Sequence, residues 1–365
     1  MTSYIGLDVH AKRTVYVVQN HEGRVTARGS VATGREGFEE IVVKAGSEVG
    51  TKVGLESGAQ SFWVSEVFAS MGMCPYVIDA REVRVKSRRP TQKSDGRDAF
   101  EICDGLRRGI YTTIVYVPSP EVRELRSLIY RRRHFVRLMS GQVSAAKSVL
   151  RAEGLRAAGS LTTLCAWERL LGGQDDARMS SRVGAHFEVW RSARKQVLFF
   201  DGEMSHALAP FQEVYDRLMT IPGVGKITSA TYIAVIAAPE RFSKSGEVVS
   251  YVGLCPSSWD SGDRVIHGPI TRRGNGECRM VLVEAAHHAG TPRHPLNPYF
   301  TRVACRQGYK KAVVFIASRL ARIMYRMWLN GEEFDVGRLN VVAERRERKK
   351  IYHYRLRREG ERASA

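Results

Sequence analysis

The sequence lacks the features that mark several common protein classes. Its six cysteines are scattered without a CxxC pair, which argues against a zinc module or a disulfide framework and favours a reducing cytoplasm. Its ten histidines form no HExxH or HxxxH pattern. It contains no run of about 18 apolar residues, and its first residues lack the charged and apolar regions of a signal peptide. We therefore expect a cytoplasmic protein without a membrane partner.

Acidic residues are scarce relative to basic ones. Asp and Glu total 38 against 57 Lys and Arg, which gives a net charge of +19. A charge of this size favours an extended polyanion as partner, with nucleic acid as the first candidate and an anionic membrane surface as the weaker alternative. The 365 residues, 43% of them hydrophobic, are enough to bury cores in two or three domains.

One acidic pair stands out in this basic chain. Residues 93–99 contain Asp95 and Asp98, three positions apart, where a helix is predicted to begin. Side chains at this spacing share a helix face. The pair therefore predicts a divalent-cation site, and the alternative is an ordinary first turn whose acids interact with the helix dipole.

The first third of the chain predicts a single α/β domain. Alternating apolar residues predict strands, helical spacing predicts helices, and the resulting order is β-β-β-α-β-α-β-α, as in the ribonuclease H-like fold. The predicted strands cover residues 3–8, 14–18, 24–27, 52–56 and 76–79, and the predicted helices cover 35–47, 61–71, 81–88 and 95–108.

Two further acids end strands of this predicted sheet. Asp8 closes the first strand and Glu56 the fourth, so a helix packed across neighbouring strand ends would bring Asp95 and Asp98 to them. Four carboxylates this close would repel one another. Mg²⁺ accepts carboxylate oxygens, and two such ions stabilise phosphoryl transfer. Mg²⁺, with Mn²⁺ as a substitute, is therefore the predicted cofactor.

The middle of the chain is predicted to be helical. Residues 119–153 and 184–218 carry imperfect heptad patterns, which favour a coiled-coil arm or a helical hairpin, with a turn at residues 172–176 between them. A cationic run in the first segment includes Arg131 and Arg132. It is either a solvated face or an edge that binds nucleic-acid backbone.

Two later segments suggest phosphate chemistry. At residues 221–230 a Gly-x-Gly turn leads into a helix that starts near Lys226, which offers backbone N–H groups and a cation to a phosphate; a plain inter-helix turn is the alternative. Residues 251–263 form a Gly- and Pro-containing loop, and cations that a phosphodiester would need follow it. The residues alone leave Ser257, Ser258 and Ser261 as alternative nucleophiles. The following cations are Arg272, Arg273 and Arg279.

Taken in order, these motifs resemble those of the DEDD-type insertion-sequence transposases. These transposases are relatives of the Piv-like DNA invertases and are described as bridge-RNA-guided recombinases. The resemblance covers nearly the whole chain, except the region near 155–185 and about the last 25 residues. Its motifs are Gly-Leu-Asp-Val-His at 6–10, Glu-Ser at 56–57, residues 93–99, Ile-Pro-Gly-Val-Gly at 221–225, Gly-Leu-Cys-Pro at 253–256 and Ser-Gly at 261–262.

The resemblance implies three regions: a RuvC-like domain at 1–112, a coiled-coil or helical arm at 113–215 and a mostly α-helical transposase domain at 216–335. The charge of the sequence adds a fourth, a basic tail at 336–365, to which the resemblance gives no guide. In the first, the Mg²⁺-binding DEDD acids would be Asp8, Glu56, Asp95 and Asp98. In the third, the catalytic serine would be Ser261.

The resemblance also implies a mechanism and partners. The serine would attack a DNA phosphate to form a covalent phosphoserine, in a homodimer or homotetramer that holds donor DNA, target DNA and a noncoding bridge RNA. Two alternatives stay open: a RuvC-like junction nuclease that uses metal-bound water, and a non-catalytic nucleic-acid scaffold. The basic tail is either a backbone-binding arm or a solvated tail, and the expected location is the cytoplasm, at the nucleoid.

Overall fold

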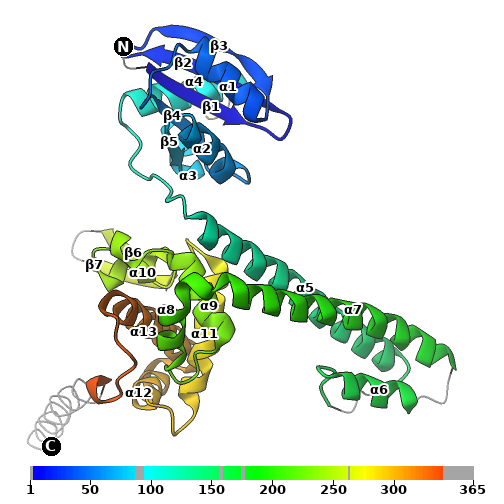
Figure 1. Cartoon of the computed structure of the whole chain (residues 1–365). Helices are drawn as coiled ribbons and strands as arrows, with labels where there is room; N and C mark the ends of the chain where they lie inside the picture. The colour runs from blue at the N-terminus through cyan, green and yellow to red at the C-terminus, as the bar shows by residue number, and fades with distance from the viewer. Residues whose placement is uncertain (1–2, 88–93, 156–158, 174–176, 262–263, 340–365) are drawn as a thin grey trace, which may run out of the picture. The chain divides into compact units, whose positions relative to one another are not determined.

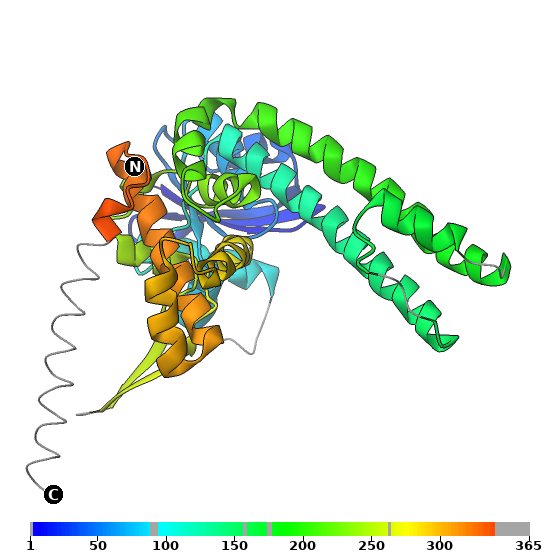
Figure 2. The ribbon, with the colours of Figure 1, turned by 90° about the horizontal axis from the view of Figure 1, so that it is seen from below.

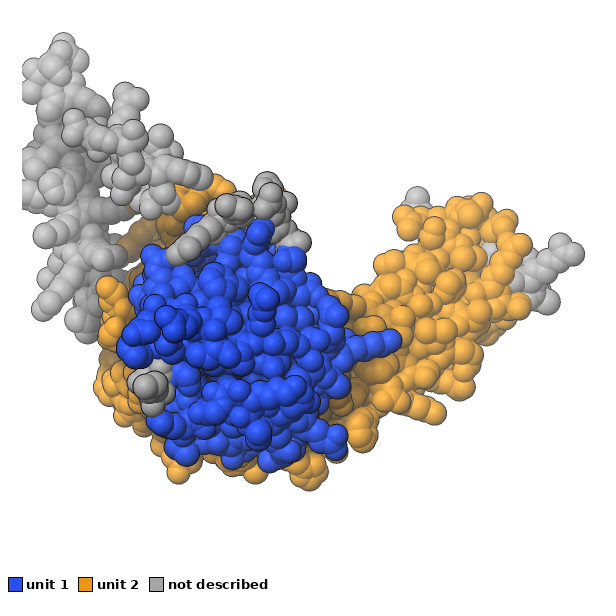
Figure 3. Space-filling view, turned by 90° about the horizontal axis from the view of Figure 1, so that it is seen from above, with its two compact units in different colours: residues 1–118 blue, residues 119–365 orange. Residues whose placement is uncertain are grey.

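The chain divides into two compact units, residues 1–118 and 119–365 (Figure 3). The structure is a computed structural model that describes residues 3–87, 94–155, 159–173, 177–261 and 264–339. Within these ranges, no helix combines the length and the apolar character that crossing a membrane requires.

Unit 1 contains a five-stranded mixed sheet (Figure 1). Its strand order is β3-β2-β1-β4-β5; β1, β2 and β3 pair antiparallel, whereas β1, β4 and β5 pair parallel. The alternating patterns of the sequence predict these strands because their apolar residues occupy one face. Their bounds are β1 (Ser3–Val9), β2 (Arg13–Asn20), β3 (Val25–Ala32), β4 (Lys52–Glu56) and β5 (Cys74–Ile78).

Helices cover both faces of this sheet. Leu7 and Leu55 pack with Phe38 of α1 (Arg35–Lys44) and Phe68 of α2 (Ser61–Ser70) in one buried cluster. The opposite face carries α4 (Asp95–Arg107), and the short α3 (Ala80–Lys86) follows β5. The mixed sheet with its helices is compatible with the ribonuclease H-like fold that the sequence predicts.

Two glycines allow α4 to lie directly on the sheet. A Cβ added at Gly6 of β1 would overlap the carbonyl oxygen of Ala99 and lie 2.6 Å from the Cβ of Cys103. A Cβ at Gly54 of β4 would lie 3.0 Å from Ile102. These glycines therefore set the height of α4 above the ends of β1 and β4.

Gly6→Ala should push α4 off the sheet. We expect the free energy of unfolding of unit 1 to fall by about 1–3 kcal/mol, as for other overpacked cores. The matched control is Gly96→Ala in the first turn of α4, where an added Cβ meets nothing within 4 Å. Trp63 is the only tryptophan among residues 1–118, so ¹⁹F-tryptophan NMR in urea reports on this unit in the full chain. Equal stability of the two variants would contradict the close packing.

A carboxylate whose side chain is only 10% exposed links α3 to the segment after α4. Glu82 accepts hydrogen bonds from the backbone N–H groups of Thr112 (2.9 Å) and Thr113 (2.6 Å), from the Thr112 hydroxyl and from Lys86. Desolvation by burial raises the pKa of Glu82, but the hydrogen bonds from Lys86, Thr112 and Thr113 prevail and lower it to about 2. The charged carboxylate is therefore the form that stabilises the fold.

Glu82→Gln should destabilise unit 1 by about 2 kcal/mol at neutral pH, because a hydrogen-bonded charge is lost. Since the folded pKa lies below the ordinary value of 4.5, the wild-type advantage is complete above pH 4.5 and is lost as the pH falls towards 2. The exposed Glu40→Gln is the control and should change stability by less than about 0.5 kcal/mol. Urea titrations at several pH values with the same ¹⁹F signal measure both, and a pH-independent difference would refute the assignment.

Unit 2 begins with a two-helix arm. Helices α5 (Pro120–Ala152) and α7 (Ala177–Ala207) lie side by side along their length (Figures 1 and 2). This packing confirms the helical hairpin, whereas the predicted coiled coil stays a prediction. At the far end of the arm lies α6 (Leu164–Gly172), which was not predicted, with Trp167 packed against Phe187 and Trp190.

The second long helix does not run through residue 218 as predicted. It ends at Ala207, and a 3-10 turn (Ala209–Phe211) containing Pro210 separates it from α8 (Gln212–Met219). Proline lacks the N–H that a continuing helix would need. The arm is therefore connected to the main core of unit 2 through this interruption between α7 and α8.

The rest of unit 2 surrounds one buried helix. All residues from Thr228 to Ile236 of α9 (Lys226–Ile236) are buried. The prediction of a loop over residues 251–263 was wrong in part, because a two-stranded antiparallel hairpin of β6 and β7 begins at Pro256. The remaining elements are α10 (Ser245–Tyr251), β6 (Pro256–Ser261), β7 (Arg264–Ile270), α11 (Gly276–His287), α12 (Asn297–Gln307) and α13 (Tyr309–Asn330).

Candidate active site

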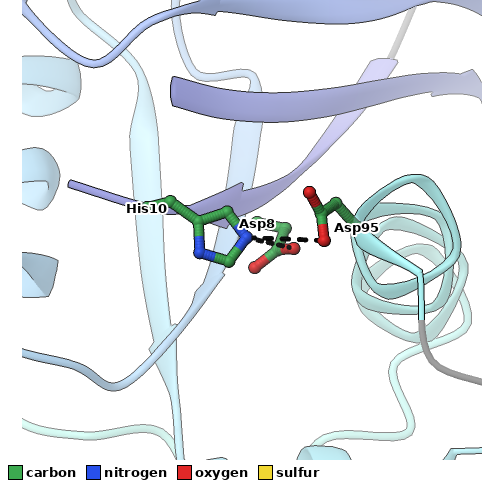
Figure 4. A group of neighbouring side chains, drawn as sticks. All are labelled: Asp8, His10 and Asp95. Atoms are coloured by element: carbon green, nitrogen blue, oxygen red, sulfur yellow. Dashed lines mark hydrogen bonds and ion pairs between the residues drawn. The ribbon is translucent and has the colours of Figure 1, made fainter. Parts of the chain in front are cut away.

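Two aspartates and one histidine meet at the end of β1. Asp8 lies in β1, His10 follows that strand, and Asp95 is the first residue of α4. One potential ligand atom from each lies within 4.8 Å of the others. The Nε2 atom of His10 is 3.1 Å from Oδ2 of Asp8 and 3.6 Å from Oδ1 of Asp95 (Figure 4). Residues 87 positions apart in sequence thus form one cluster.

Strand register explains why Asp8 faces α4. Leu7 of β1 pairs with Leu55 of β4, so Asp8 and Glu56 are the next residues of two adjacent parallel strands. Side chains alternate along a strand, so both share the face of Gly6 and Gly54, which α4 covers. The same glycines that admit α4 therefore bring its first turn to the strand ends.

Positive groups already balance this cluster. The guanidinium of Arg13, at the start of β2, donates to Oδ2 of Asp95 at 2.8 Å. This hydrogen bond, together with the charges of His10 and Arg13, holds the pKa of Asp95 below its ordinary value, although desolvation opposes it. Asp95 is accordingly a carboxylate at neutral pH, the form that a metal ion requires.

The donor set fits a hard divalent cation. Carboxylate oxygens are the ligands that Mg²⁺ and Mn²⁺ prefer, and Mg²⁺ keeps several of its waters when bound. The side chains of Asp8 and Asp95 are 20% and 41% exposed, so water reaches both. The imidazole of His10 can either ligate the ion directly or hold Asp8 in position through its contact with Oδ2.

The other two predicted acids lie nearby in the fold but outside this cluster. Glu56 ends β4 with an exposed side chain, and Asp98 lies one helical turn beyond Asp95. Among the described residues, the group within 4.8 Å contains neither of them. Their part in metal binding stays a prediction.

The predicted nucleophile lies on the hairpin of unit 2. Ser261 is the last residue of β6, and its register partner is Arg264 of β7. The hairpin extends away from the helices of this unit (Figure 2). At its base, the hydroxyl of Ser257 donates to the carbonyl oxygen of Pro269 at 2.8 Å. Ser257 therefore has a structural contact that holds the two strands together.

Comparison with known proteins assigns both parts of the chain to one family. Residues 5–153, which include the acidic cluster, match a family model for DEDD-type IS110 transposases. Residues 215–300, which include the hairpin, match the model described as "Transposase IS116/IS110/IS902 family". The chain belongs to this transposase family. That membership confirms the predicted family and the predicted class of enzyme.

Individual relatives agree with this assignment. A Sinorhizobium fredii protein named as a transposase, y4pF/y4sB, is 25% identical over 66% of this chain and 64% of its own length. The transposase for insertion sequence element IS1111A of Coxiella burnetii is 22% identical over 80% of this chain and 81% of its own length. The pilin gene-inverting protein of Moraxella lacunata is 30% identical over 32% of this chain and 38% of its own length, which supports the predicted relation to DNA invertases.

The predicted phosphate-binding cations of this transposase differ in their surroundings. Lys226, Arg272 and Arg273 are exposed, and Gly225 caps the helix that Lys226 begins, as the Gly-x-Gly motif predicts. In contrast, Arg279 donates to the carbonyl oxygen of Val252 at 3.0 Å and so holds the loop before the hairpin.

The predicted cations of the arm also differ in whether they are exposed or paired. Arg131 is exposed, whereas the Nε of Arg132 lies 2.6 Å from Oδ1 of Asp201 on α7. Arg132 therefore links the two helices of the arm. Nucleic-acid binding by the predicted cations stays a prediction, and residues 340–365, which include most of the basic tail, lie outside the described residues.

The sequence does not predict one member of the cluster or one of its partners. His10 stands in the motif at 6–10, of which only Asp8 is predicted as a ligand, and nothing in the sequence predicts the contact of Arg13 with Asp95. A signal for His10 exists, because residues i and i+2 point to the same face of a strand. Arg13 follows the tight turn that the sequence predicts around residues 10–12, in which the N–H of His10 donates to the Arg13 carbonyl at 3.0 Å. The turn alone does not indicate that the Arg13 side chain reaches Asp95.

Proposed function

We propose that this chain is the DNA transposase of a mobile insertion element and that it uses a divalent metal and a serine nucleophile. The observation that carries the proposal is the cluster of Asp8, His10 and Asp95 inside the region that matches the DEDD transposase model. Glu56 and Asp98 stand at the same edge of unit 1 and complete the proposed acidic set.

The residues of unit 1 have defined roles in this proposal. Asp8 and Asp95 hold the metal with Glu56 and Asp98, His10 orients Asp8, and Arg13 neutralises Asp95 when no metal is bound. Mg²⁺ or Mn²⁺, when bound, would supply the charge that stabilises a phosphate during transfer. Without the cation, the acids would repel the DNA backbone, so they do not act alone.

The serine performs the bond exchange. The Oγ of Ser261 forms a bond to a DNA phosphorus, one phosphodiester P–O bond breaks, and the serine proton passes to the departing deoxyribose oxygen, which leaves as a hydroxyl. The phosphoserine diester retains the bond energy, so attack by another DNA hydroxyl rejoins the strands and restores the serine. A serine hydroxyl is a weak nucleophile at neutral pH and needs such activation.

Partners follow from the charge and from the family. The net charge of +19 supports binding to donor DNA, target DNA and a structured noncoding bridge RNA, whose base pairing would carry the sequence information. We propose a homodimer or homotetramer in which the acids of one subunit and Ser261 of another act on the same strand.

A covalent-adduct assay tests the proposal. The protein, with the RNA that copurifies with it, is incubated with labelled DNA of its element in Mg²⁺, in Mn²⁺ or in EDTA, and is then denatured. Label that migrates with the protein in either metal but not in EDTA supports the proposal. Cleaved DNA without attached protein would indicate a metal-dependent nuclease instead, and bound but uncut DNA would indicate a scaffold.

A further inference from the structure

A cationic groove runs along α13, away from the hairpin tip. A cavity of about 1440 Å³ is lined by α13, residues 243–245 and the base of the β6–β7 hairpin. From α13 it receives Lys311, Phe315, Arg322 and Arg326, which recur at helical spacing over about 22 Å of helix. We call this feature the α13 groove. None of these four residues belongs to a motif in the sequence.

The charge of the α13 groove suits a polyanion. Lys244, Arg272 and Lys310 add to its cations. Among the described residues, no carboxylate forms an ion pair with Lys311, Arg322 or Arg326. Three acids lie at the end of the groove. Glu332 and Asp335 pair with Arg338, and Glu333 is exposed.

The floor of the groove is apolar. Phe315 is 40% exposed and Leu329 is 46% exposed, and Val314 and Ile323 lie between the cations. A DNA duplex presents phosphates and would gain nothing from such a floor. An unpaired strand presents base faces as well, and proteins that bind single strands combine a cationic groove with aromatic stacking.

We propose that the α13 groove binds an unpaired DNA strand, with phosphates on Lys311, Arg322 and Arg326 and a base on Phe315. This inference rests on the proposed function, which supplies DNA as the substrate. Pro256 and Ile270 at the hairpin base line the groove, and Ser261 ends β6 five residues further along, about 16 Å away. The groove thus holds a strand within a few nucleotides of the serine. The chain's own residues 345–362 are a poor occupant, because nine Lys or Arg against three Glu would repel the groove.

The test measures oligonucleotide binding without catalysis. Fluorescence anisotropy of labelled dT12 is recorded with the full chain in EDTA across a range of salt concentrations. Lys311→Ala/Arg322→Ala should weaken binding about tenfold or more and reduce the salt slope by about 1.4, the value expected for two lost phosphate contacts on a single strand. The control Arg191→Ala/Lys195→Ala removes one arginine and one lysine from α7 and should leave both values nearly unchanged.

Variants of Phe315 test base stacking separately from charge. Phe315→Ala should weaken dT12 binding about 5- to 100-fold, as for one lost base stack, whereas Phe315→Trp should retain it. Equal losses in the α13 and α7 double variants would overturn the proposal, as would a loss confined to U12 RNA or a greater loss for duplex DNA. The adduct assay is independent of this binding test, because it depends on Ser261 and metal. If the wild type forms the adduct but the α13 variants bind dT12 normally, the groove proposal alone is refuted. If the α13 variants lose dT12 binding but the wild type forms no adduct, the proposed chemistry alone is refuted.

Discussion

Ser261→Ala should abolish the covalent protein–DNA adduct while leaving DNA binding intact. Removal of a nucleophile commonly reduces catalysis by about 10⁴- to 10⁶-fold, and the adduct itself cannot form without the attacking oxygen. The hydroxyl adds little to affinity, so the dissociation constant for DNA should change by less than about threefold. Adduct yield on denaturing gels and binding by anisotropy measure the two effects separately.

The neighbouring serines provide matched controls on the same hairpin. Ser257→Ala removes the hydrogen bond to the Pro269 carbonyl and should cost about 1 kcal/mol of stability without preventing adduct formation. Ser258→Ala should likewise retain the adduct. If Ser261→Ala formed the adduct at the wild-type level and either control did not, the nucleophile would have to be reassigned.

Asp8→Asn should remove both metal binding and strand cleavage. The substitution keeps the size of the side chain but takes one carboxylate from the cluster with His10 and Asp95. The loss of a metal that stabilises phosphoryl transfer should lower the cleavage rate by about 10³-fold or more. Mn²⁺ binding, followed by electron paramagnetic resonance of the free ion, gives a readout that does not depend on activity.

A control and a second variant make this prediction specific. Glu39→Gln removes an exposed carboxylate from α1, on the opposite face of the sheet, and should leave Mn²⁺ binding and cleavage unchanged. Asp95→Asn should behave like Asp8→Asn. Unchanged Mn²⁺ affinity in both aspartate variants would rule out this cluster as the metal site.

Much of unit 1 could be predicted because its signals are local. Alternating apolar residues mark β1, β2 and β4, and the pair Asp95 and Asp98 marks the start of α4. The closeness of Asp8 and Asp95 is not local, since it depends on how closely α4 approaches Gly6. The topology predicts that the acids lie at the same edge of the sheet. It does not predict the contacts of His10 and Arg13 with Asp95, which depend on side-chain packing.

Unit 2 was harder to predict because its features depend on contacts between residues that are distant in sequence. The residues of β6 include proline and several polar side chains, which are typical of loops, and only pairing with β7 makes them a strand. The helix that carries Lys311 and Arg322 has no motif that indicates a binding site. The α13 groove forms only because folding brings these cations next to the hairpin base. Short helices such as α6 are stabilised mainly by contacts like those of Trp167 with Trp190.

The most direct measurement is the identity of the residue that carries DNA in the trapped adduct. Trypsin should release residues 245–264 as one peptide with five serines, so fragmentation by mass spectrometry after nuclease digestion can distinguish them. The account predicts a nucleotide remnant on Ser261, present in Mn²⁺ and absent in the Asp8→Asn variant. A remnant on any other residue, or metal-dependent cleavage with no remnant at all, would contradict it.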